Sequence, residues 1–348
     1  MLLSEYDYNL PEELIAQMPA DKRENSKMLV LDRKNKSIEH KHFYNIVDML
    51  DENYLLVMNN TKVMPARLIG YKDSGAKIEV FLLKQKDTCW DVLIKPSKRV
   101  KIGTYIKISD ELSVKVVKKL EDNGEWLVEL LYDLSQNLMD ILHRNGNIPL
   151  PPYIERKVNN QDLKKLDFER YQTVYAKDEG SVAAPTAGLH FTKDILKNLE
   201  NKGVDLAYVT LDVGLGTFRP VQCENILEHK MHSESFEISQ EASEKINKAK
   251  LNGKKIVAVG TTTVRTLETA FQKFGCIKPC RDSSELFIYP PFKFNVVDSL
   301  ITNFHLPKST LLMLVSAFAE KDFIFKAYKT AIENKYRFFS YGDCMFIK

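Results

Sequence analysis

The segment KIVAVGTTTVRTLETAF (255–271) decides how the chain is expected to fold. Its apolar run, Lys255–Val259, predicts a strand, and Gly260 ends that strand. Three threonines then lead into Thr261–Phe271, whose pattern predicts a helix. A buried strand followed directly by a helix is the unit from which α/β sheets are built.

Strand and helix keep alternating around this segment. Thr192 is expected to cap a helix that ends at Gly203, and a strand follows at Val204–Leu211. A further helix begins at Ser239 and ends near Asn252. This order is typical of an α/β domain with a mostly parallel or mixed sheet.

Residues 70–133 have a different pattern, in which short strand-like runs follow one another at even spacing. Turns with Asp, Asn, Gly or Pro separate these runs, which predicts a small barrel followed by a helix at Leu134–Arg144. The expected strands are Lys77–Leu83, Trp90–Lys95, Thr104–Ser109, Leu112–Lys118 and Glu125–Tyr132.

The N-terminal segment has strand character at Met28–Asp32 and Tyr54–Asn59 but no core of its own. We therefore expect it to join the second half of the chain. Residues 1–69 and 150–348 would form one discontinuous α/β domain with a mixed sheet. Residues 70–149 would be an inserted all-β barrel domain.

The composition is ordinary for a globular protein, with 44% hydrophobic and 28% charged residues in 348. This length allows a sizeable core and two domains. The best membrane candidate, Leu311–Ala319, is too short to cross a bilayer, and the N-terminus lacks a signal-peptide pattern. We expect a cytoplasmic protein without a membrane segment. The five cysteines complete no zinc spacing, so we also expect no metal.

Polar residues beside the turns of the second half are candidates for a binding site. Thr261, Thr262 and Thr263 place hydroxyls and free N–H groups at a helix start, which suits a carboxylate or phosphate. Arg265 would add a bidentate donor. Ordinary capping, with Arg265 on the surface, is the alternative.

The loop LDVGLGTFRP (211–220) is a second candidate. Gly214 and Gly216 would let a ligand approach the backbone closely, although the full nucleotide-binding fingerprint is absent. Asp212 and Arg219 flank the two glycines and offer an acceptor and a cation. A structural turn with a salt bridge explains the spacing equally well.

Three histidines are candidates for the site. His190 comes just before an expected helix start, whose dipole disfavours the protonated ring and so suits a neutral general base. The alternative is a structural His190 that only hydrogen-bonds a carbonyl, which is the more frequent role of a single histidine, and the same two interpretations apply to His305. His232 and Glu234 would share one face if their segment were a strand.

Residues 95–119 carry eight basic side chains against Asp110 and Glu111, a local excess of six positive charges. Such a stretch could follow a phosphate backbone. A solvated face that protects edge strands from aggregation is the alternative. The basic residues are Lys95, Lys98, Arg99, Lys101, Lys107, Lys115, Lys118 and Lys119.

Over nearly its whole length the chain resembles the S-adenosylmethionine:tRNA ribosyltransferase-isomerases of queuosine biosynthesis. The resemblance implies an α/β domain with an inserted β-barrel. It also rests on motifs that keep the family's order, namely YDYNLPEELIAQMP (6–19), NNTKVMPARL (59–68), GAKIEVFLL (75–83), PLPPYIER (149–156), ERYQTVYA (169–176), AVGTTTVRTLE (258–268) and YRFFSYGDCMFI (336–347).

The activity that this resemblance implies joins two substrates. The ribosyl part of S-adenosylmethionine is transferred and isomerised onto the 7-aminomethyl group of a 7-deazaguanine at the tRNA wobble position. The products are epoxyqueuosine-tRNA, adenine and methionine. S-adenosylmethionine is then a cosubstrate, tRNA is the partner, and we expect a monomer without a prosthetic group.

The resemblance also implies roles for the candidate residues. A sulfonium acidifies the ribose C5′ protons, so a base is required; His190 is the first candidate and His305 the second. His232 would protonate or hydrogen-bond the departing adenine. The methionine carboxylate is expected to bind Arg265, Thr261, Thr262 and Thr263, and its ammonium group to bind Asp212 or Glu234. Gly214 and Gly216 are expected to contact the substrate from their loop, and the ribose, base or phosphate is expected to contact Arg67, Arg219 and Asp343. The tRNA is expected to contact Lys95, Lys98, Arg99 and Lys101.

Two other functions fit parts of the sequence. An S-adenosylmethionine-dependent RNA methyltransferase would share donor and acceptor, but would normally have a fuller Gly-rich loop. A non-catalytic RNA-binding module would explain the basic stretch and leave the histidines without a purpose.

Overall fold

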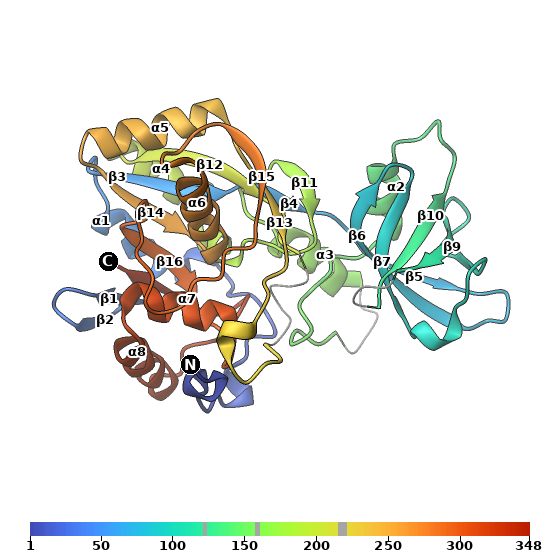
Figure 1. Cartoon of the computed structure of the whole chain (residues 1–348), viewed down its shortest axis with the longest axis horizontal. Coiled ribbons are helices and arrows are strands. Elements are labelled where there is room, and N and C mark those ends of the chain that lie inside the picture. The colour runs from blue at the N-terminus through green and yellow to red at the C-terminus, as the bar shows by residue number, and fades with distance from the viewer. Residues whose placement is uncertain (121–123, 157–160, 215–220) are drawn as a thin grey trace.

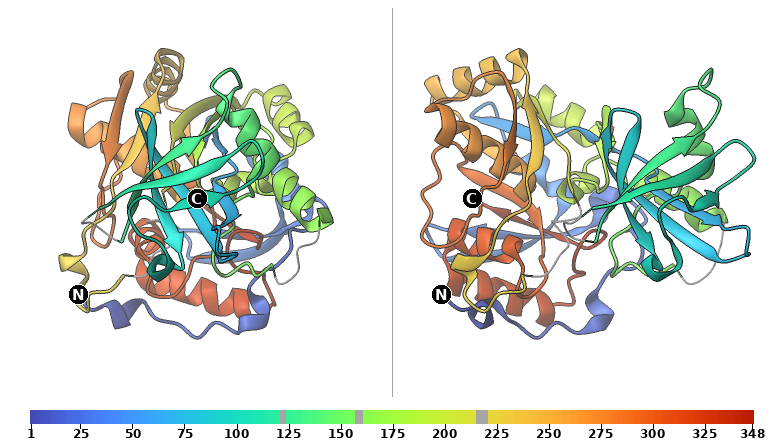
Figure 2. Two further views of the ribbon diagram at one scale, coloured as in Figure 1. Left: turned by 90° about the vertical axis from the view of Figure 1, so that its right-hand side faces the viewer. Right: turned by 45° about the vertical axis from the view of Figure 1, so that its right-hand side comes forward.

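The computed structural model describes residues 1–120, 124–156, 161–214 and 221–348. The chain forms a layered α/β domain from which a β-barrel projects (Figures 1 and 2). Within the described residues, no helix combines the length and the apolar character needed to cross a membrane.

A mixed nine-stranded sheet forms the centre of the α/β domain, in the order β15-β13-β12-β3-β14-β16-β17-β1-β2. Its four inner strands β12, β3, β14 and β16 are parallel to one another, and antiparallel pairs flank them. The strands are β1 (Lys27–Asp32), β2 (Ser37–His42), β3 (Tyr54–Asn59), β12 (Asp205–Leu211), β13 (Glu234–Ile238), β14 (Lys255–Val259), β15 (Cys280–Ser284), β16 (Ser299–Asn303) and β17 (Cys344–Ile347).

Helices cover both faces of this sheet because its inner strands are apolar on both sides. In β3, Leu55 and Val57 belong to the core under α5, α6, α7 and α8, whereas Leu56 and Met58 belong to the core under α1 and α4. The helices are α1 (Ile46–Met49), α4 (Lys193–Asn201), α5 (Gln240–Leu251), α6 (Thr261–Phe274), α7 (Thr310–Ala319) and α8 (Lys321–Glu333).

The expected α/β alternation is confirmed. Thr192 caps α4 by accepting a hydrogen bond from the N–H of Ile195, and Ser239 caps α5 in the same way. The N-terminal strands join the second half, because β1 pairs with β17 and β3 lies between β12 and β14.

The inserted barrel is also confirmed, as a closed ring of strands in the order β10-β7-β6-β5-β8-β9. Alternate residues point into its core, where Trp90 and Trp126 are 5% exposed. Helix α2 starts at Leu138, later than expected, because Asn137 caps it. The elements are β5 (Arg67–Tyr71), β6 (Lys77–Lys86), β7 (Cys89–Lys95), β8 (Tyr105–Lys107), β9 (Ser113–Lys119), β10 (Trp126–Leu131) and α2 (Leu138–Asn145).

Short elements connect the two parts. Strand β4 (Thr61–Val63) pairs in parallel with β11 (Asp178–Ser181), and α3 (Gln161–Arg170) precedes β11. The segments that enter and leave the barrel are joined by backbone hydrogen bonds between Arg67 and Asn147. A 3-10 helix, η6 (Thr186–His190), then leads into α4.

Candidate active site

A cavity of about 670 Å³ lies at the carboxyl ends of the parallel strands β14 and β16. Its wall includes residues 260–262 after β14, residues 302–306 at the end of β16, and residues 184–187 around η6. Binding sites of open α/β sheets occur at this edge, since the loops that follow parallel strands all emerge there. We call this space the strand-end cavity.

The start of α6 faces the strand-end cavity without a side-chain cap. Gly260 is the N-cap residue, has φ +87°, and has no side chain to accept the first N–H groups of the helix. Thr261 and Thr262 line the cavity, and Thr262 Oγ1 is buried with no hydrogen-bond partner among the described residues. These donors favour an anionic or polar ligand group at this point.

Thr263 does not share this position. It is fully buried, and its Oγ1 donates to the carbonyl of Val259 at 2.7 Å. Of the three threonines, Thr263 therefore stabilises the helix start, and the other two face the cavity.

His305 lies in the wall of the strand-end cavity. Its Nε2 is 3.0 Å from Thr302 Oγ1, and its backbone N–H donates to the hydroxyl of Tyr328 at 2.8 Å. Burial lowers the pKa of His305 to about 3, so the ring is neutral at physiological pH.

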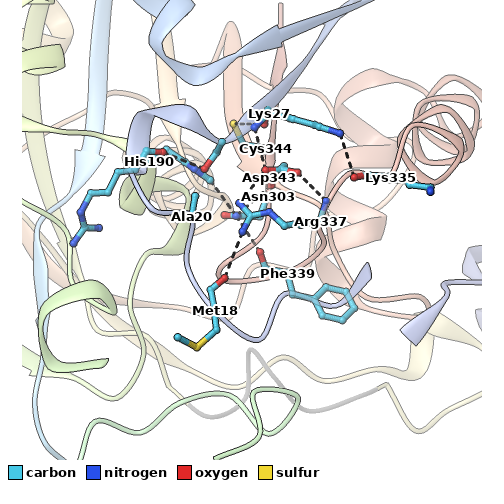
Figure 3. A network of polar contacts seen from close by, with 12 residues as sticks. Met18, Ala20, Lys27, His190, Asn303, Lys335, Arg337, Phe339, Asp343 and Cys344 are labelled. Atoms are coloured by element: carbon cyan, nitrogen blue, oxygen red, sulfur yellow. Dashed lines mark hydrogen bonds and ion pairs between the residues drawn. The ribbon is translucent and has the colours of Figure 1, made fainter. Parts of the chain in front are cut away.

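His190 lies behind this wall. Asn303, which does line the cavity, donates from Nδ2 to His190 Nε2 at 3.3 Å and accepts from Thr186 Oγ1 at 3.1 Å (Figure 3). The amide of Asn303 therefore lies between His190 and the cavity. Burial, with the charges of Arg337 and Arg23, lowers the pKa of His190 to about 3.

Asp343 holds the turn that completes the wall. It is 2% exposed and accepts hydrogen bonds from the backbone N–H groups of Lys27 and Arg337 and from Arg337 Nη2 (Figure 3). This turn carries Phe339 and Ser340 to the cavity. Asp343 thus supports the site without lining it.

Arg265 and Glu234 form a buried ion pair away from the cavity wall. Arg265 also donates to the carbonyls of Leu286 and Ser284, and Glu234 accepts from the N–H of Gly214. The alternative that places Arg265 on the surface is therefore wrong, because the carboxylate of Glu234 and two carbonyls satisfy the guanidinium inside the protein. The prediction that Arg265 binds the methionine carboxylate stays a prediction, and its guanidinium does not line the cavity.

His232 and Glu234 do not share a strand face. Strand β13 begins at Glu234, and His232 lies outside it with an exposed side chain. The conditional prediction of one polar face is wrong, since Glu234 points inward to Arg265 while His232 is in solvent.

The remaining candidates are spread over the molecule. Asp212 accepts from Thr61 Oγ1 at 2.9 Å, and burial raises its pKa, helped by the charges of Asp178 and Glu234. Arg67 lies on the barrel and pairs with Glu79 at 2.7 Å. The predictions for Gly216 and Arg219 fall outside the described residues.

The eight basic side chains of residues 95–119 fall into two groups. Lys107 and Lys115 form ion pairs with Asp110 and Glu129. The other six are exposed and make no ion pair with any described residue, and two of them, Lys118 and Lys119, lie at the end of β9. The remaining four precede β8 in the chain and are Lys95, Lys98, Arg99 and Lys101. We call these four residues the barrel basic group.

No cluster of three or more His, Cys, Asp or Glu side chains suited to a metal occurs in the described part of the chain. The five cysteines are free thiols.

Comparison with known proteins decides the family. The model of a family described as queuosine biosynthesis protein matches residues 3–347. The chain belongs to this family. Among its curated relatives, the S-adenosylmethionine:tRNA ribosyltransferase-isomerases of Thermosipho melanesiensis and Clostridioides difficile are 54% and 50% identical to it, each over the full length of both chains.

A solved structure agrees with this membership in the queuosine biosynthesis family. The crystal structure of S-adenosylmethionine tRNA ribosyltransferase from Thermotoga maritima is 37% identical and covers 99% of this chain and all of its own. Its TM-score of 0.55 supports a common fold.

Sequence reasoning missed three residues of the site in this queuosine biosynthesis protein. Asn303 lies directly after the apolar run of β16, a position that could have marked it. Tyr153 and Ser340 lie far apart in the sequence, yet their hydroxyl oxygens are 2.6 Å apart in the cavity wall. Only the fold brings the PLPPYIER and FFSYGDC motifs together.

The two buried histidines predict how stability depends on pH. Their folded pKa values of about 3 lie below the ordinary 6.5, so the unfolded chain binds more protons between these values. Stability is full above pH 6.5 and falls as the pH decreases, by about 2 kcal/mol per histidine at pH 5. Urea unfolding of His190→Gln and His305→Gln between pH 7 and 5 should show a smaller decrease than the parent.

The exposed His42 provides the control. His42→Gln replaces a ring at the surface, outside the two buried sites, and should keep the parent's pH dependence. An unchanged pH dependence in both buried-histidine variants would contradict the assignment of neutral buried rings.

Proposed function

We propose that this chain transfers and isomerises the ribosyl part of S-adenosylmethionine onto the 7-aminomethyl group of 7-deazaguanine at the tRNA wobble position. The products are epoxyqueuosine-tRNA, adenine and methionine. Full-length relatives named S-adenosylmethionine:tRNA ribosyltransferase-isomerase support this proposal. The observation that carries it in the structure is the strand-end cavity with its uncapped helix start and unpartnered Thr262 hydroxyl.

In this proposal the strand-end cavity binds S-adenosylmethionine. The methionine carboxylate binds the first N–H groups of α6 and the hydroxyl of Thr262, because the helix dipole favours an anion there. The rings of Tyr153 and Phe339, with centroids 4.8 Å apart, offer an apolar wall on which the adenine can pack. The cosubstrate is consumed in each turnover and is not a prosthetic group.

His305 is the histidine that we place against the ribosyl group. It lines the cavity, and in this proposal its ring accepts a proton from a carbon that the adjacent sulfonium acidifies. His190 orients the amide of Asn303 instead, since that amide separates its ring from the cavity. The Arg265–Glu234 pair joins the backbone N–H of Gly214, next to the cavity-lining Val213, to α6.

We propose that the enzyme acts as a monomer. We propose that it works in the cytoplasm, where its tRNA substrate is available. The barrel basic group then provides the tRNA contact outside the α/β domain, because exposed unpaired cations attract the phosphate backbone.

The reaction itself is tested by mass spectrometry. Incubation with S-adenosylmethionine and tRNA that carries 7-aminomethyl-7-deazaguanine should release adenine and methionine and form epoxyqueuosine in equal amounts. Reactions with tRNA lacking the modified base are the control and should release neither product. S-adenosylhomocysteine with a methylated nucleoside would contradict the proposal in favour of a methyltransferase, and tight tRNA binding without any product would indicate a binding module.

Thr262→Val tests the carboxylate site. Valine keeps the shape but removes the hydroxyl, so KM for S-adenosylmethionine should rise about threefold to tenfold. The melting temperature should not fall, because this hydroxyl has no hydrogen-bond partner among the described residues. Thr263→Val is the matched control: it removes the hydrogen bond to Val259 and some stability but should keep the KM. An unchanged KM in Thr262→Val would exclude the hydroxyl from the site.

Charge reversal tests the barrel basic group. The triple variant Lys98→Glu, Arg99→Glu and Lys101→Glu should weaken tRNA binding, and its log affinity should depend less on log salt, by about 0.7 for each phosphate that the variant no longer neutralises. Lys329→Glu on α8, which lies at the opposite end of the molecule (Figure 1), should bind tRNA like the parent. Equal affinity and salt dependence in the triple variant would show that the barrel basic group is only a solvated face.

A further inference from the structure

A second, smaller cavity of about 250 Å³ lies beside the strand-end cavity. Ser340 lines both spaces. His190 lines the second cavity, and its hydrogen-bond partner Asn303 lines the first. The two cavities therefore share one wall, made by the His190–Asn303 pair and Ser340.

Two arginines line the second cavity, and both donate to backbone carbonyls. Arg23 donates from Nη1 to Leu189 and from Nη2 to Glu169, at 3.0 Å in each case. Arg170 donates from its two terminal nitrogens to Asp21 and Ala20. These hydrogen bonds fix both side chains in place.

No described carboxylate forms an ion pair with either of these arginines. Arg156 shows the contrast: it comes from the segment before α3 and holds Asp167 through two hydrogen bonds of 2.9 and 2.8 Å. Asp167 therefore pairs with Arg156 and not with Arg23 or Arg170. In addition, Arg170 Nε is buried and has no partner among the described residues.

The two arginines lie close together, since Arg23 Nη1 is 3.5 Å from the backbone carbonyl of Arg170. Burial and then the charge of Arg170 lower the pKa of Arg23, and the charge of Glu169 offsets this only in part. His190, which is neutral, adds no charge of its own. Two confined cations with an unused donor form a site that an oxyanion would complete, since planar guanidinium groups match phosphate and carboxylate oxygens.

We propose that this second cavity, the arginine pocket (Arg23, Arg170, His190 and Ser340), binds a phosphodiester of the tRNA anticodon loop. The inference rests on the proposed function. A wobble base that enters the strand-end cavity has to leave its stack, while its backbone stays outside the reacting space. A cationic pocket across the shared wall is suitably placed to hold that backbone and to set the register of the base.

The position of the arginine pocket favours a phosphate over the methionine carboxylate. The carboxylate already has donors at the start of α6, on the far side of the His190–Asn303 pair from the arginines. A phosphodiester of the second substrate would be the anion that lies outside the strand-end cavity yet next to it.

Arg170→Gln tests the proposal by equilibrium binding of a synthetic anticodon stem-loop RNA without S-adenosylmethionine. We expect affinity to fall about 10- to 100-fold, with a salt slope smaller by about 0.7, and KM for S-adenosylmethionine to stay at the parent value. Arg170→Lys should retain part of the affinity because it keeps the charge. If Arg170→Gln does not fold, Arg23→Gln is the second variant. It should then show the decreases in RNA affinity and salt slope that are expected of Arg170→Gln.

Arg33→Gln is the matched control. Arg33 is also partly buried and donates to the backbone carbonyls of Phe318 and Asp298, but it does not line the arginine pocket. Its replacement should remove comparable structural hydrogen bonds and leave RNA affinity and salt slope unchanged. A similar decrease of affinity in Arg33→Gln would mean that the arginine effect is structural and would overturn the proposal.

Neutral methylphosphonate linkages, introduced one at a time into the loop, locate the contact. At one position the parent should lose affinity while Arg170→Gln loses none, because the two changes remove the same interaction. Parental RNA affinity in Arg170→Gln, or a raised KM for S-adenosylmethionine with normal RNA binding, would overturn the proposal. Because binding is measured without turnover, failure of the proposed reaction would be detected separately, in the product assay of the parent enzyme.

Discussion

The parallel pairing of β12, β3, β14 and β16 is the constraint on which the rest of the structure depends. It brings the ends of four distant segments to one edge of the sheet and so creates the strand-end cavity. Strand β3 can occupy the middle because its side chains are apolar on both faces. The chain leaves the sheet after β3, forms the barrel, and returns to the sheet at β12, so the insertion does not interrupt this pairing.

Around this edge, most buried polar groups are satisfied inside the protein, and two that are not belong to residues lining the two cavities. Glu234 neutralises Arg265, and Asp343 accepts three hydrogen bonds in the turn beside the site. Thr262 Oγ1 at one cavity and Arg170 Nε of the other have no partner in the described part of the chain. Because an unsatisfied buried polar group destabilises a fold, such groups indicate where a ligand belongs.

Much of the fold and part of the site could be predicted from the sequence, and the failures have a common cause. The helix caps Thr192 and Ser239 were predicted because capping depends on residues a few positions apart. Arg265 was expected on the surface or at the ligand because its partner Glu234 comes from a strand 31 residues away. His232 was misplaced because an apolar alternation does not show where a strand begins.

The sequence by itself determined the α/β class, the inserted barrel, the family and the motifs that supply the site, because periodicity, turns and motif order are local properties of the chain. Only the tertiary structure decided that His305 lines the cavity while His190 lies behind Asn303, since both histidines occur in similar local settings. It also decided that Arg23 and Arg170, 147 positions apart, meet at one pocket. Such distances depend on strand pairing between remote segments, which no short stretch of sequence encodes.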